Sequence, residues 1–360
     1  MQLVAYGAQD IYLTGNPQIT FFKVVYRRHT NFSMEAIEQT MLGTVGKGNT
    51  QTSTISRNGD LIHRTYLEVE WNTLFTVTPQ SDPGAYMLDT VELEIGGQLI
   101  DRHTGQWLNT WAQLTERATN SLEDTIFQEM SAMGGTSAAN NFKDQKYFVP
   151  LQFWFCRNPG LALPLIALQY HEVKLKVKWS TRDSVPHTCK LYVDYIYLDT
   201  DERRRFAQVS HEYLIEQIQY QSLAASKINE LNFNHPVKEL VWCLKPGDDN
   251  GVEVSLDFKN YHITLNGHDR FSKRDTKYFT RAQVWQHHSG FGGIYTNNIA
   301  VYSFALKPEE HQPSGTCNFS RIDNAQLVCD QDFDGEGVIF AVNYNVLRIM
   351  SGMGGLAYSN

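Results

Sequence analysis

The chain has 360 residues and a mass of 41.2 kDa, with 42% hydrophobic and only 19% charged residues. This composition excludes an intrinsically disordered protein, and the length favours two domains. The net charge of -8 argues against a protein that binds nucleic acid directly through its phosphates. We therefore expect a protein that is compact throughout.

The N-terminal segment departs from this acidic average. In residues 1–31, Lys23, Arg27 and Arg28 are opposed only by Asp10. This local excess of positive charge indicates either a solvated strand end or a contact patch for an acidic partner. The segment lacks the pattern of a secretion signal, and no stretch of the chain is apolar enough to cross a membrane, so we expect neither a signal peptide nor a transmembrane segment.

Strict alternation of apolar and polar residues follows in the first half of the chain. In 67–71 (LEVEW) the apolar side chains share one face and two glutamates share the other. The same pattern recurs in 91–95 (VELEI) and 173–179 (VKLKVKW). Such alternation predicts half-buried strands of antiparallel sheets.

Helical spacing is rare in the sequence. Trp107, Leu108, Trp111 and Leu114 recur at helical spacing, which predicts short helices between Trp107 and about Met133, inside a long connection between strands.

A charged stretch near the middle of the chain separates two parts. Residues 199–213 (DTDERRRFAQVSHEY) lack apolar alternation and are weakly helical in character. We therefore predict an N-terminal arm and first domain at 1–204, a linker at 205–211 and a second domain at 212–360.

The second half contains two further patterns. Residues 252–258 (VEVSLDF) alternate like a half-buried strand. Asp330, Asp332 and Asp334 resemble the start of an EF-hand calcium loop, but Ala341 stands where that loop needs a bidentate glutamate. We predict a polar turn there and no metal site.

No motif in the sequence indicates catalysis. The segments that begin at His171 and His211 lack the second histidine of a zinc-binding HExxH motif, and neither a nucleophile elbow nor a phosphate loop occurs. The five cysteines include no CxxC pair and are expected to be free thiols. We expect neither an enzyme nor a bound cofactor.

Segments of the first half recur in the second half in the same order, each with similar strand and turn residues. The matching pairs are 93–102 with 263–271, 147–155 with 297–306, and 193–205 with 342–352. Three matches in order favour a duplicated domain. With abundant strands, few helices and many turn residues, the sequence predicts an all-β protein of the sandwich class.

Several longer segments resemble the major capsid proteins of large nucleocytoplasmic DNA viruses. They are GAQDIYLTGNPQITFFKVVYRRHTNFSMEAIEQT at 7–40, RNPGLALPLIALQYHEVKL at 157–175, YVDYIYLDTDERRRFA at 192–207, NIAVYSFALKPEEHQPSGTCNFSRIDNAQL at 298–327 and NYNVLRIMSGMGGLAYSN at 343–360. The resemblance therefore runs from one end of the chain to the other.

This resemblance implies two consecutive eight-stranded antiparallel jelly rolls, with short helices in loops. It also implies a homotrimer whose six jelly rolls form a nearly hexagonal capsomer, and capsomers that tile an icosahedral shell. The expected location is the virion capsid, after assembly in the host cytoplasm. The expected partners are other copies of the chain, neighbouring capsomers, minor capsid proteins and, indirectly, the inner viral membrane.

Within the family, Met1–Arg28 would form an arm and the first strand at the base of the capsomer. Lys23, Arg27 and Arg28 are then candidate contacts for partners on the base side. The loops at Gly247–Asn250 and His287–Asn298 are candidates for the outer surface.

Two other functions are compatible with the same architecture. One is a capsid-like scaffold that shapes a viral membrane during assembly and is then shed. The other is a glycan-binding jelly-roll module, for which the tract FGGIYTNN at 291–298 is a weak candidate.

Overall fold

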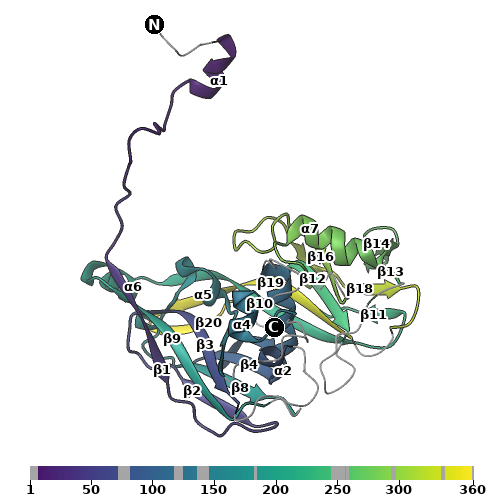
Figure 1. Cartoon of the computed structure of the whole chain (residues 1–360), viewed down its shortest axis with the longest axis horizontal. Helices are drawn as coiled ribbons and strands as arrows, with labels where there is room; N and C mark the ends of the chain where they lie inside the picture. The colour runs from purple at the N-terminus through teal and green to yellow at the C-terminus, as the bar shows by residue number, and fades with distance from the viewer. Residues whose placement is uncertain are drawn as a thin grey trace.

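The computed structural model consists of two jelly rolls that follow one another in the chain, preceded by an N-terminal arm (Figure 1). The structure describes residues 7–71, 82–116, 125–135, 146–181, 185–244, 256, 259–292, 297–333 and 337–358.

The first jelly roll packs two antiparallel sheets face to face. Its strands are β1 (Phe32–Gln39), β2 (Thr50–Thr54), β3 (Leu61–Glu70), β4 (Leu88–Ile95), β5 (Gln98–Thr104), β6 (Lys146–Pro150), β7 (Leu163–Pro164), β8 (Val173–Trp179) and β9 (Thr188–Leu198). One sheet has the order β1-β9-β3-β6, with β7 paired to the start of β3, and the other has the order β2-β8-β4-β5. Its helices are α2 (Pro83–Tyr86), α3 (Gly105–Thr115), α4 (Ile126–Ser131), α5 (Trp154–Arg157), η2 (Pro159–Leu161) and η3 (Leu165–Ala167).

The second jelly roll repeats this plan. Its strands are β10 (His211–Leu223), β11 (Ile228–Glu230), β12 (Pro236–Leu244), β13 (Asn260–Leu265), β14 (His268–Asp269), β15 (Arg274–Asp275), β16 (Ile299–Ser303), β17 (Cys317–Asn318), β18 (Ala325–Cys329), β19 (Gly337–Met350) and β20 (Met353–Leu356). The two main sheets have the orders β10-β19-β12-β16 and β11-β18-β13-β14. The helical segments are η4 (Tyr278–Ala282), α7 (Gln283–His287) and η5 (Phe319–Arg321).

The strand orders confirm the predicted duplication. The repeated segments become the β4–β5 and β13–β14 hairpins, the strands β6 and β16, and the strands β9 and β19. Each pair occupies the same place in its own jelly roll, because β9 lies second in its sheet as β19 does, and β6 lies last as β16 does. The predicted fold class, two eight-stranded jelly rolls, is therefore confirmed.

The alternating segments form strands with one face in a core, as predicted. In β8, for example, Val173, Leu175, Val177 and Trp179 are buried. Lys178 on the opposite face pairs with Asp89 in more exposed surroundings. The predicted helices between Trp107 and Met133 are confirmed as α3 and α4.

Some predictions fall wholly or partly outside the described residues. Of the strand predicted at 252–258, only Leu256 is described, and it is buried in the second core. The loop at Gly247–Asn250 lies outside the described residues, as does Asp334. Asp330 is described, and its carboxylate accepts hydrogen bonds from the backbone and side chain of Asn260, at 3.0 and 2.7 Å.

Helix α6 (Thr200–Gln208) connects the two jelly rolls. Asp199 caps its first turn by accepting a hydrogen bond from the backbone of Glu202 at 3.0 Å. Arg203 extends from the helix to pair with Asp60 of the first jelly roll at 3.0 Å. The helix is therefore tied to the body of the protein at this end.

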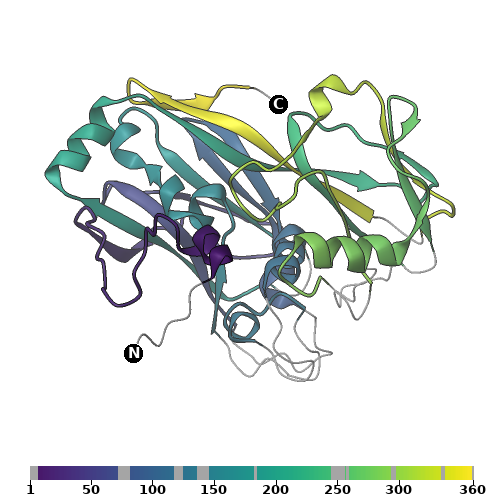
Figure 2. The same ribbon diagram turned by 90° about the horizontal axis from the view of Figure 1, so that it is seen from above.

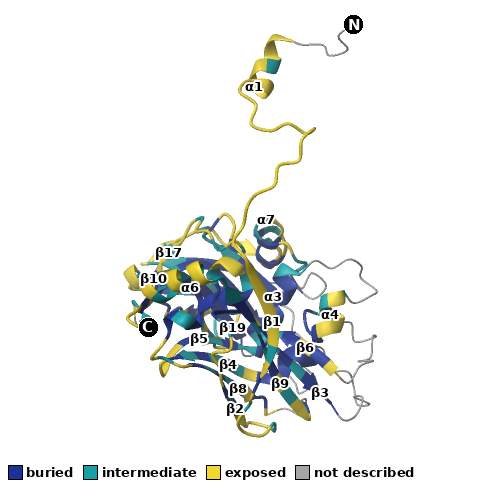
Figure 3. Cartoon of the chain, turned by 90° about the vertical axis from the view of Figure 1, so that its left-hand side faces the viewer, coloured by how far each residue is buried: buried dark blue, intermediate teal, exposed yellow. Residues whose placement is uncertain are grey.

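The arm corrects two sequence predictions, namely a compact chain throughout and a first strand inside Met1–Arg28. η1 (Ala8–Asp10) and α1 (Ile11–Thr14) lie away from the body, and the chain after them runs back to the body without strand pairing until β1 starts at Phe32 (Figures 1 and 3). The side chains of Phe21 and Phe22 are 93% and 100% exposed. Apolar residues here do not form a strand, because a strand needs a ladder partner and the described part of this chain offers none.

Candidate assembly surfaces

The two jelly rolls share an apolar core at their junction. Thr104 caps helix α3 of the first roll, because its hydroxyl accepts a hydrogen bond from the backbone of Trp107 at 3.1 Å. The helix carries Trp107, Trp111 and Leu114 into contact with β12, β16 and β19 of the second roll. The Trp107 ring lies 5.1 Å from that of Phe340. The junction is therefore a packed core, and its burial opposes movement between the rolls.

Strands β10 and β19 extend this contact. Their ends near the first roll place Ile215, Leu347 and Ile349 in the core of that roll. Figure 2 shows the long yellow strand β19 extending from the second roll over the first. Two strands that belong to one sheet thus contribute to both cores.

The C-terminal hairpin, formed by the end of β19 and by β20, is hydrogen-bonded to the first roll. The backbone of Tyr170 donates a hydrogen bond to the Gly352 carbonyl at 2.9 Å. The His171 ring lies within hydrogen-bond distance of Gly354, with its Nδ1 2.9 Å from the carbonyl oxygen. A Cβ at Gly354 would come within 2.7 Å of the Leu168 side chain, which would have to shift to accept it. His171 has a structural role here.

Buried charges cross the junction beside the apolar core. Glu216 of β10 accepts hydrogen bonds from Arg157 of the first roll and from Lys238 of β12, the latter at 2.7 Å. Burial alone would raise the pKa of Glu216, but the charges of Arg157 and Lys238 and a hydrogen bond from His311 outweigh it and hold that pKa well below its usual range. The carboxylate therefore stays ionised and joins the two rolls.

A buried histidine forms a second charged contact nearby. His288 lies between two carboxylates, 2.9 Å from Glu239 and 3.2 Å from Glu309. Burial would lower the pKa of His288, but the two carboxylates raise it to about 9. At neutral pH the ring is a cation held between two anions.

Part of the tract His287–Asn298, a candidate for the outer surface, is buried within the chain, although Ser289 is exposed. His288, Asn297 and Asn298 are buried, and 293–296 lie outside the described residues. The backbones of Gly290 and Gly292 donate hydrogen bonds to carbonyls at the end of α3, at 2.7 and 2.8 Å. The described part of this tract packs on the junction, because its backbone groups satisfy the last carbonyls of a neighbouring helix.

Sequence reasoning missed the charged residues of the junction. One signal was present: in β12 the sequence VKELVWCL would be a continuous apolar run except for Lys238 and Glu239. A strand with such a run is buried on both faces, so charges within it must find buried partners. The identity of those partners, Glu216 and His288, follows only from the fold.

The structure does not bring the predicted base-side residues into a site within one chain. Lys23, Arg27 and Arg28, hereafter the arm cations, are exposed, and no carboxylate among the described residues pairs with them. The arm also exposes large apolar side chains, which are Ile11, Tyr12, Leu13, Ile19, Phe21, Phe22, Val24, Val25 and Tyr26. Such a combined apolar and basic surface is typical of a segment that is covered in an assembly.

No group of three or more histidine, cysteine, aspartate or glutamate side chains in the described ranges is placed to hold a metal ion. None of the helices in that part of the chain is both long and apolar enough to cross a membrane.

The fold is that of the double jelly-roll capsid proteins of viruses. A chain in the solved PBCV-1 virus capsid, a quasi-atomic model, matches with a TM-score of 0.81 and 38% identity, over 95% of this chain and 100% of that chain. The Faustovirus major capsid protein shares the fold at 13% identity, with a TM-score of 0.69 over 96% of this chain and 94% of that one.

The sequence comparisons define the family more closely. Residues 20–199 match the model of the major capsid protein N-terminus, and residues 202–355 match that of the large eukaryotic DNA virus major capsid protein. The major capsid protein of Pyramimonas orientalis virus is 53% identical, and that of Paramecium bursaria Chlorella virus 1 is 42% identical, each over 100% of this chain and 99% of the relative. The chain belongs to the family of large eukaryotic DNA virus major capsid proteins, and its role is structural.

Proposed function

We propose that three copies of this chain form a closed trimer whose six jelly rolls make a nearly hexagonal capsomer, and that these capsomers tile an icosahedral shell. The observation that carries this proposal is the presence of two jelly rolls with the same strand order in one chain. Three such chains around one axis present six similar units at the edge of the trimer, and a cyclic trimer closes its own contacts.

The junction between the two jelly rolls supports this role, because a capsomer needs subunits of fixed shape. The shared core around Trp107, the Glu216 network and the C-terminal hairpin at Gly354 all oppose a change of angle between the two rolls. A single flexible linker would leave the six units without a fixed arrangement. Trimer contacts of this kind bury above ~2,000 Å², whereas contacts between capsomers are smaller and more polar.

The arm extends the proposal to partners outside the body of the protein. The arm cations contact a protein partner on the side from which the arm leaves, which is the base of the capsomer. Minor capsid proteins are the proposed partners there, and the inner membrane is contacted only through them. The role involves no catalytic step and no obligatory cofactor, and assembly takes place in the host cytoplasm.

The mass of the purified chain in solution tests the trimer. We expect light scattering to give about three times 41.2 kDa, and we expect this mass to persist across a dilution series. A closed trimer has no free contact surface of the same kind, so it does not grow with concentration. A stable monomer at all concentrations contradicts the proposal.

A further inference from the structure

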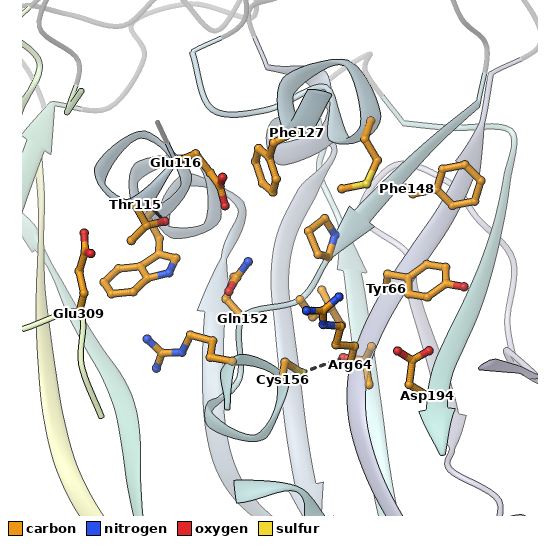
Figure 4. Close-up of a pocket in the computed structure, with 16 residues that line it drawn as sticks. Arg64, Tyr66, Thr115, Glu116, Phe127, Phe148, Gln152, Cys156, Asp194 and Glu309 are labelled. Carbon is orange, nitrogen blue, oxygen red and sulfur yellow. Dashed lines mark hydrogen bonds between the residues drawn. The ribbon is translucent and has the colours of Figure 1, made fainter. Parts of the chain in front are cut away.

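The first jelly roll carries an open cleft on the outer face of its β1-β9-β3-β6 sheet (Figure 4). The cleft has a volume of about 740 Å³. Strands β3, β6 and β9 contribute Tyr66, Phe148 and Asp194, and helix α4 contributes Phe127 and Met130. It is therefore formed by rigid elements on opposite sides of an open space.

The sheet side of the cleft is aromatic. The ring of Tyr66 stacks on Tyr192 with 5.4 Å between centroids and meets Phe148 edge to face at 6.2 Å. Phe148 and Met130 each remain 37% exposed. An aromatic surface of this kind binds apolar and aromatic side chains of a partner.

The cleft also holds two half-buried carboxylates that lack partners among the described residues. Burial raises the pKa of Glu116, and the nearby charge of Glu309 raises it further. Burial also raises the pKa of Asp194 against the opposing effect of Arg64, with which Asp194 forms no ion pair. A basic ligand would supply what both carboxylates lack.

The other charged side chains of the cleft already have partners. Arg157 binds Glu216, and Glu309 binds His288. These pairs leave Glu116, Asp194 and Arg64 as the charges open to a ligand, with an excess of negative charge. A partner that is aromatic and basic at once fits this combination better than an acidic or purely apolar one.

The arm has this chemistry. Between Ile19 and Arg28 it exposes aromatic and aliphatic side chains together with the arm cations. Residues 15–31 contain no strand, and a chain of this length spans up to about 55 Å when extended. Figure 1 shows that the arm leads away from its own body, so it is placed to reach a second copy.

We propose that residues 19–28 of one copy dock in the sheet-face cleft of a neighbouring copy. The apolar side chains of the arm cover the aromatic floor around Tyr66 and Phe148, and the arm cations face Glu116 and Asp194. This inference rests on the proposed capsomer, because the capsomer supplies the neighbouring copy. It adds that copy to the minor capsid proteins as a partner of the arm cations.

Photo-cross-linking of the full chain tests this docking. The photoreactive residue p-benzoylphenylalanine replaces Phe22, and a control chain carries it at Leu306, which is 76% exposed outside the arm. After irradiation, we expect the Phe22 variant to give a denatured species of about twice 41.2 kDa. Mass spectrometry should place the cross-links in residues 125–135 or 146–157, whereas the control should give none there.

Charge variants sharpen the test. With Glu116→Gln and Asp194→Asn combined, the yield of the cross-linked species should fall about fivefold, as expected for the loss of partly exposed ion pairs. The matched control combines Glu230→Gln and Asp201→Asn, which neutralise exposed carboxylates away from the cleft. That control should keep the original yield.

The remaining outcomes separate this inference from the proposed trimer. A three-chain mass by light scattering, with cross-links only inside one copy or outside the cleft, overturns the docking and leaves the capsomer intact. An equal loss of yield in both pairs of charge variants also overturns it. A monomeric mass contradicts the capsomer itself.

Discussion

Replacing Trp107 by alanine should lower the free energy of unfolding, because this side chain belongs to the core that joins the two jelly rolls. The side chain is 2% exposed and packs between Trp111 and Phe340, so the substitution removes a large ring from the junction. Burial of about 200 Å² at about 25 cal/mol per Å² corresponds to about 5 kcal/mol as an upper bound. Measured Phe or Trp to Ala substitutions in cores cost about 3–5 kcal/mol, so we expect a loss of about 4 kcal/mol.

Guanidinium unfolding followed by circular dichroism measures this effect at a fixed protein concentration, because oligomerisation shifts apparent stability. Trp285→Ala is the matched control, since that tryptophan is 82% exposed. We expect the control to change stability by less than about 0.5 kcal/mol. If both variants unfold at the same denaturant concentration, the junction is not the packed core described here.

Three further predictions concern charges. Glu216→Gln removes the carboxylate that pairs with the buried Lys238 and with Arg157, and it should cost about 3–5 kcal/mol in thermal unfolding; a melting temperature equal to that of the native chain would refute the network. The pKa of His288 is raised to about 9 from 6.5. The charged ring therefore stabilises the folded protein fully below about pH 6.5, and this contribution is lost as the pH rises to about 9. The native chain should therefore lose stability over that range and His288→Gln should not, so parallel pH profiles would contradict this assignment. Neutralising the arm cations with glutamine should leave the trimer mass unchanged but weaken base-side contacts, and normal shell assembly would count against that role.

The strands and their duplication could be predicted because their cause is local. In β8 every second residue is apolar, and a period of two places these residues on one face of a pleated strand. The hairpin turns of β4–β5 and β13–β14 likewise recur as similar short sequences. Patterns of this kind need no knowledge of distant residues.

The arm could not be predicted from the same pattern. Phe21, Phe22, Val24 and Val25 have the composition of a strand, but a strand also needs a neighbour with which to pair. Whether that neighbour lies in the same chain or in another copy depends on the assembly. The unusual composition of this segment is visible in the sequence, but its position in the structure is not.

The junction was missed for a related reason. His288 belongs to a tract rich in glycine and polar residues, which is typical of surface loops. It is buried because the ring of Trp111 in α3 and the carboxylates of Glu239 and Glu309 surround it. Those partners come from both jelly rolls, so only the docking of the two rolls defines the site.

Electron cryo-microscopy of the purified chain tests the capsomer most directly. We expect particles with threefold symmetry and a nearly hexagonal outline, in which six jelly-roll densities alternate between the first and second roll. Particles with one or two copies of the chain, or with a variable angle between the rolls, would contradict it.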